Sequence, residues 1–79
     1  MKREKLINLR KSKKLTQEKL AEKIGISTVY VRKIENGDVD PGKNTLLKYQ
    51  KYFNEEASTL FPDIFFSVND KKLIGNSSA

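Results

Sequence analysis

The stretch LTQEKLAEKIGISTVYVRKIENG, residues 15–37, decides the fold because it contains the start and stop signals of two short helices. Thr16 is a good N-cap for the first helix, and Gly25 is a good residue to end it. Ser27 is the N-cap of the second helix, and Gly37, which tolerates positive φ, ends that one. Only three residues separate the helices, so we expect them to cross steeply instead of running antiparallel.

The second of these helices has an inner face, on which Val31 and Ile34 lie three residues apart, and an outer face. Four side chains are expected on the outer face: Thr28, Val29, Arg32 and Lys33. β-branched residues are poor helix formers, so helix stability does not explain why two of them stand on an exposed surface. We therefore interpret this face as one that contacts another molecule.

The composition limits what a chain of 79 residues can do. Such a chain forms one small domain, too small for an enclosed catalytic cavity with a lid. It has no cysteine and no histidine, which excludes disulfides, thiolate chemistry and the commonest zinc sites. There is no glycine-rich phosphate loop, and the carboxylates are scattered along the chain. We expect no enzyme activity, no cofactor and no metal.

Charge is distributed unevenly along the chain, whose net charge is +6. Residues 1–37 contain eleven lysines and arginines and four acids, whereas residues 38–79 contain five and six. A basic half attracts polyanions, nucleic acid first and anionic membranes second, although a merely solvated surface is the simpler alternative. Lysines alternate with glutamates, which argues against a membrane-surface helix. The start MKREKLINLR is not a signal peptide, and we expect a cytoplasmic protein.

Helices are also predicted on both sides of the quoted stretch. Residues 2–12 form one helix, in which Leu6, Leu9 and Arg10 share a face. Residues 38–44 are a loop, and Asn44 or Thr45 then caps another helix. Three side chains recur on its inner face: Leu46, Tyr49 and Phe53. A short fifth helix is predicted from about residue 55 to residue 61, before Pro62.

Residues after Pro62 change in character. Four apolar β-forming side chains come close together: Ile64, Phe65, Phe66 and Val68. Asn69 and Asp70 then favour a turn, so we predict a short extended segment or hairpin with a frayed end. The chain is accordingly divided into a domain at residues 1–62 and an extension at residues 63–79.

The quoted stretch resembles the DNA-binding core of lambda repressor and Cro-like regulators, the Xre family. Twelve positions match in register: Leu15, Thr16, Gln17, Leu20, Ala21, Gly25, Ser27, Val31, Ile34, Glu35, Asn36 and Gly37. The resemblance continues through Pro41 and FNEEASTLF, and covers roughly residues 6–61. It implies an all-α, compact five-helix fold with a helix-turn-helix formed by its second and third helices.

The resemblance also implies roles for individual residues. The base-reading positions are the four outer residues of the third helix: Thr28, Val29, Arg32 and Lys33. The positions that hold the DNA backbone are Gln17 and Asn36, with Ser27 as an addition. Tyr30, which departs from the small hydroxyl residue common at its position, and Lys14, which adds positive charge, are assigned the same role. Ordinary polar residues at helix ends are the alternative interpretation for Gln17 and Asn36, and Tyr30 can instead pack against the loop. Arg10 and Glu35 match an ion pair that links the first and third helices.

Family members usually bind two half-sites as two-fold dimers. We expect the apolar segment of the extension to supply the dimer contact, through Ile64, Phe65, Phe66 and Val68, unless it folds back on its own domain. The expected function is sequence-specific binding of double-stranded DNA by a transcription regulator, most often a repressor. The alternative is an antitoxin-type module, which binds a small protein partner as well as its own operator.

Overall fold

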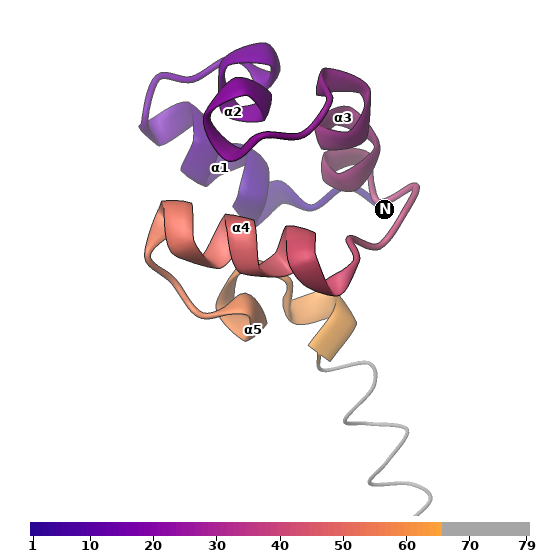
Figure 1. Cartoon of the computed structure of the whole chain (residues 1–79). Helices are drawn as coiled ribbons and strands as arrows, with labels where there is room; N and C mark the ends of the chain where they lie inside the picture. Colours follow the sequence, from indigo (N-terminus) through magenta and orange to yellow (C-terminus); the bar gives the residue numbers. More distant parts are fainter. Residues whose placement is uncertain (66–79) are drawn as a thin grey trace, which may run out of the picture.

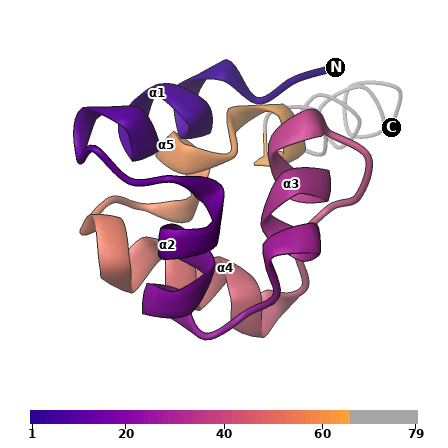
Figure 2. The same ribbon diagram turned by 90° about the horizontal axis from the view of Figure 1, so that it is seen from above.

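The computed structural model describes residues 1–65, and these residues are helical, with no β-strand among them. The helices are α1 (Glu4–Ser12), α2 (Gln17–Ile24), α3 (Thr28–Asn36), α4 (Lys43–Phe53) and α5 (Ala57–Leu60). In Figure 1, α2 and α3 lie above α4, and α5 lies below it. Figure 2 shows α1 and α3 on different sides of α2. The prediction of an all-α fold, with a helix-turn-helix formed by α2 and α3, is confirmed.

The ends of α2 and α3 are those expected from the sequence. The Thr16 hydroxyl accepts a hydrogen bond from the Lys19 N–H at 3.1 Å, and the Ser27 hydroxyl accepts one from the Tyr30 N–H at 3.0 Å. Gly25 and Gly37 have φ values of +75° and +79°, the left-handed conformation that glycine adopts without steric cost. These local interactions place the turn between the two helices at residues 25–27.

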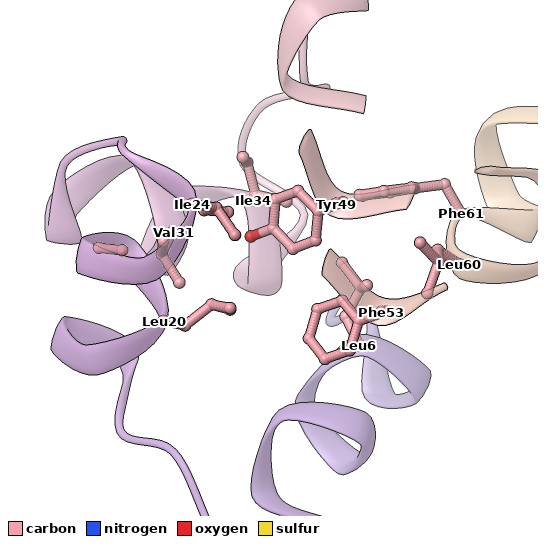
Figure 3. Packing of buried hydrophobic residues seen from close by; sticks show 10 residues of the cluster. Leu6, Leu20, Ile24, Val31, Ile34, Tyr49, Phe53, Leu60 and Phe61 are labelled. Atoms are coloured by element: carbon pink, nitrogen blue, oxygen red, sulfur yellow. The ribbon is translucent and has the colours of Figure 1, made fainter. Parts of the chain in front are cut away.

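The hydrophobic core joins all five helices (Figure 3). Its buried members are Leu6, Leu20, Ala21, Ile24, Val31, Ile34, Tyr49, Phe53, Leu60 and Phe61. Tyr49 of α4 is central: its ring meets Phe61 edge-to-face at a centroid distance of 5.4 Å and stacks on Phe53 at 6.1 Å. α4 thereby connects the α2–α3 pair above it with α5 below it.

The Tyr49 hydroxyl is buried and has no hydrogen-bond partner among the described residues. Burial raises the pKa of Tyr49 well above its usual value of 10.0, and the nearby charge of Glu35 raises it further. The phenol therefore stays neutral in the folded protein. An unpaired buried hydroxyl is destabilising, because it loses its hydrogen bonds to water on folding.

The start of α4 differs from the prediction that Asn44 or Thr45 caps it. The N-cap is Gly42, and no side chain caps the helix. Thr45 is instead buried one turn before Tyr49, so the inner face of α4 starts one residue earlier than the predicted Leu46, which is half-buried. Farther along α4, the exposed Gln50 accepts a hydrogen bond from the Ala57 N–H at 2.9 Å. This bond satisfies a donor in the first turn of α5.

Residues 62–65 are helical, which corrects the expectation that Ile64 and Phe65 belong to an extended segment. The N–H groups of both residues donate to the Phe61 carbonyl, at 3.1 and 3.3 Å. Pro62 suits the first turn of a helix, and both side chains pack against the core. These contacts outweigh a β preference that depends strongly on context. Phe66 and Val68 lie outside the described residues.

None of the helices within residues 1–65 combines the length and the apolar character needed to cross a bilayer.

Candidate nucleic-acid interface

The outer face of α3 is accessible. Val29 is 47% exposed, Arg32 and Lys33 are exposed, and Thr28 is half-buried. No ion pair within residues 1–65 involves Arg32 or Lys33. Opposite them, Val31 and Ile34 are fully buried. α3 is therefore held by its inner face, while two methyl-bearing side chains and two cations remain available to a ligand.

A buried network of charged side chains fixes how α3 is seated. Arg10 of α1 pairs with Glu35 of α3 through two hydrogen bonds, Nε to Oε2 at 2.7 Å and Nη2 to Oε1 at 3.0 Å. Arg10 Nη1 also donates to the Leu15 carbonyl at 2.8 Å. Two parallel bonds from one guanidinium to one carboxylate restrict geometry more than a single bond does. The expected pair of Arg10 and Glu35 is thus present and links α1 to α3.

Gln17, at the start of α2, extends this network. Its Nε2 donates to Glu35 Oε1 at 3.0 Å, so Glu35 receives hydrogen bonds from both α1 and α2. One of the two amide hydrogens is engaged in this bond, and the other remains available to a phosphate. The spacing of residues in the sequence did not indicate the Gln17–Glu35 bond, because it joins two helices across a turn.

The other predicted backbone-contacting residues occupy different positions around α3. Ser27 caps α3, and Asn36 is the last residue of the helix and half-buried. The Tyr30 hydroxyl accepts a hydrogen bond from the Gly42 N–H at 3.2 Å, so this side chain packs against the loop before α4. Its own O–H remains free to donate. Lys14 is exposed in the turn between α1 and α2, with φ of +59°.

Arg3 is the residue near this site that sequence reasoning missed. It precedes α1, yet it is only 7% exposed. Its Nη1 donates to the carbonyls of Ile34, at 2.7 Å, and Val39, at 2.9 Å. Its Nη2 pairs with Asp40 at 2.6 Å, and its Nε donates to Asp63 at 3.1 Å. The local sequence offers no signal for this, because Arg3 stands among other charged residues that are exposed.

The residues proposed for a dimer contact are partly engaged within the chain. Ile64 and Phe65 are half-buried and pack against the core of their own domain. Asp63, just before them, is bound by Arg3. The structure therefore brings this segment close to the loop that follows α3, a proximity that the sequence did not indicate.

Comparisons with known proteins agree with this geometry. A family model described as helix-turn-helix matches residues 6–60, which run from within α1 to the end of α5. A search of curated proteins finds no match.

Proposed function

Because the chain belongs to the helix-turn-helix family of lambda repressor and Xre-like DNA-binding proteins, we propose that it regulates transcription by sequence-specific binding of double-stranded DNA. The observation that carries the proposal is the outer face of α3, which offers accessible side chains on a firmly seated helix. The major groove is about 12 Å wide and admits one α-helix. In this proposal α3 enters the groove with its first two turns.

Base reading is assigned to the outer residues of α3. Thr28 and Val29 present methyl groups, which suit contact with the methyl group of thymine. Arg32 lies one turn later and can donate two hydrogen bonds to O6 and N7 of guanine, worth about 1–3 kcal/mol of discrimination against other bases. The flexible side chain of Lys33 can reach the same acceptors or a phosphate.

Backbone contacts are assigned to residues around the helix ends. At the start of α2, main-chain N–H groups lack partners within the helix, and the positive end of the helix dipole favours a phosphate there. Gln17 stands at this end with one amide hydrogen uncommitted to Glu35. Ser27, Tyr30, Asn36 and Lys14 would add further contacts, which position the protein without reading sequence.

Affinity measurements on two variants separate base reading from backbone contact. Binding sites are first selected from random DNA, and affinities are then measured for a selected site and for unrelated DNA. Arg32→Ala should weaken the selected site by about 10- to 100-fold and unrelated DNA much less. Gln17→Ala should weaken both by a similar factor.

Lys51→Ala is the matched control, because it removes the same charge from the exposed surface of α4. It should reduce affinity less than Arg32→Ala does, and equally for both DNAs. If Arg32→Ala lowers affinity by the same factor on every sequence, the assignment of Arg32 to base reading is wrong. If the wild-type protein selects no sequence at all, the proposed function itself fails.

We further propose that two chains bind two half-sites and repress by occluding a promoter. One α3 contacts only a few base pairs, and a two-fold dimer doubles the contacted surface. The parts of Ile64 and Phe65 that remain accessible, together with Phe66 and Val68, are proposed as the dimer contact. Light scattering at micromolar concentration should give about twice the chain mass of 9.1 kDa. A monomer at that concentration would contradict this assembly.

A further inference from the structure

Arg3 connects three segments that are distant in the sequence. It binds the last turn of α3 through Ile34, the following loop through Val39 and Asp40, and the C-terminal helical segment through Asp63. Its main-chain N–H also donates to the Glu35 carbonyl at 2.8 Å. The guanidinium also lies over the Phe61 ring, 5.5 Å from its centre. These contacts restrict the position of the Arg3 side chain.

The loop that Arg3 holds runs beside α3. It leaves the end of α3 at Gly37, and it returns to the first turn of α3, where the Gly42 N–H donates to the Tyr30 hydroxyl. The loop therefore runs back beside α3 toward its first turn (Figure 2). If α3 enters a groove, a segment that flanks it lies along one wall of that groove, and the wall is a row of phosphates.

The first residue of the chain also packs at the end of α3, against Gly37. An ideal Cβ built on Gly37 would lie 1.9 Å from the Met1 carbonyl oxygen, so no other residue fits there while the first residues hold this position. The N-terminal residues thus pack directly on the junction between α3 and the loop. Arg3 acts at the same junction with its guanidinium.

Asp40 makes this arrangement relevant to DNA binding. Its side chain is 71% exposed in the loop, and an unpaired carboxylate there would repel a phosphate. Arg3 Nη2 lies 2.6 Å from Asp40 Oδ1, and Arg3 also holds the adjoining Val39 carbonyl. The charge of Asp40 is thereby offset in part, because Arg3 also pairs with Asp63 at 3.0 Å, and the side chain of Asp40 is directed toward Arg3.

We propose that Arg3 is a positioning residue for DNA binding: it holds the loop after α3 in place and offsets part of the charge of Asp40 at the wall of the groove. The proposal rests on the proposed function, because it assigns Arg3 a role in how α3 meets DNA. Arg3 itself is buried and touches no DNA. Its effect reaches the ligand through Asp40 and the loop.

A double-mutant cycle tests the proposal at a temperature where circular dichroism shows every variant folded. Arg3→Met should weaken binding to a selected site by roughly tenfold at low salt, and less at high salt because salt screens the exposed carboxylate. Adding Asp40→Asn to Arg3→Met should restore the part of the lost affinity that comes from the exposed charge, whereas Asp40→Asn alone should change little. Such non-additivity is the expected result for two groups in contact.

Asp38 provides the matched control, since it is an exposed aspartate of the same loop and no ion pair within residues 1–65 involves it. Asp38→Asn should have the same effect with and without Arg3. If Asp40→Asn rescues Arg3→Met no better than Asp38→Asn does, the neutralising role is refuted. If folded Arg3→Met binds as tightly as the wild type, the whole proposal is refuted.

Loop position is measured independently of DNA by hydrogen exchange. The Gly42 amide should exchange faster in Arg3→Met than in the wild type, while amides in the middle of α2 should keep their rates. If the wild type binds no DNA but Gly42 exchanges faster in the variant, the proposed function fails while Arg3 still holds the loop. Where Arg3→Met does not fold, Arg3→Gln, which removes the charge but keeps a hydrogen-bond donor for the buried carbonyls, is measured under the same criteria.

Discussion

Replacing Glu35 with alanine is expected to lower the free energy of unfolding by about 3–5 kcal/mol. Glu35 is 1% exposed and accepts hydrogen bonds from both Arg10 and Gln17. Arg10 is only 8% exposed, so the removal of Glu35 leaves a buried guanidinium without a counter-charge inside the protein. The total stability of a 79-residue domain is about 4–12 kcal/mol, so this variant should lose a large share of it.

Urea unfolding followed by circular dichroism measures this loss. Glu22→Ala is the control, because Glu22 forms an exposed pair with Lys19 at 3.9 Å and should contribute less than about 1 kcal/mol. A second comparison uses Arg10→Met together with Glu35→Leu, which removes both charges and should recover much of the stability. Equal losses for Glu35→Ala and Glu22→Ala would show that the buried network does not support the fold.

Phe61→Ala is expected to cost about 3–5 kcal/mol of stability. Phe61 is fully buried between α5 and residues 62–65, and its ring contacts Tyr49. Truncation leaves a cavity under the Tyr49 ring and removes the aromatic surface beneath the Arg3 guanidinium. Because α5 has only four residues, it depends on such packing and not on its own helix stability.

Two further variants identify the source of the Phe61 effect in the same urea measurement. Leu47→Ala removes a large apolar side chain that is 53% exposed on α4, and it should change stability by less than about 0.5 kcal/mol. Tyr49→Phe removes only the unpaired hydroxyl and should raise stability by about 1 kcal/mol. A loss in Tyr49→Phe as large as that in Phe61→Ala would mean that the hydroxyl, and not ring packing, stabilises this part of the core.

The stability gap between the wild type and Tyr49→Phe should widen above pH 10, the usual pKa of tyrosine. Burial raises the pKa of Tyr49 in the folded state, so the unfolded chain releases this proton first as the pH rises. The stability that comes from keeping the phenol neutral is complete below pH 10 and is lost above it. The phenylalanine variant lacks this contribution to the pH dependence.

Much of the fold could be predicted from the sequence because its signals act over a few residues. Thr16 and Ser27 each cap an N–H three positions ahead, and Gly25 and Gly37 end their helices through their own φ angles. The outer face of α3 follows from helical periodicity alone. Pairing of Arg10 with Glu35 was inferred from inward-facing positions and from the family resemblance.

Residues 62–65 show where this reasoning failed. Ile64 and Phe65 prefer β structure in isolation, but in the folded protein their N–H groups bind the Phe61 carbonyl and their side chains reach the core. That outcome depends on where α4 and α5 place the chain. No local pattern within the segment contains that information.

Local chemistry in the sequence by itself determined the helix-turn-helix, its boundaries and the residues on the exposed side of α3, because caps, glycines and periodicity need no distant partner. Only the tertiary structure decided the role of Arg3, which joins residues 31 to 60 positions away, and the bond from Gln17 to Glu35. The residues next to an arginine in the sequence do not show whether its guanidinium will be exposed or buried. The difference arises when folding brings carbonyls and carboxylates around it, since only then does burying the charge cost less than leaving it in water.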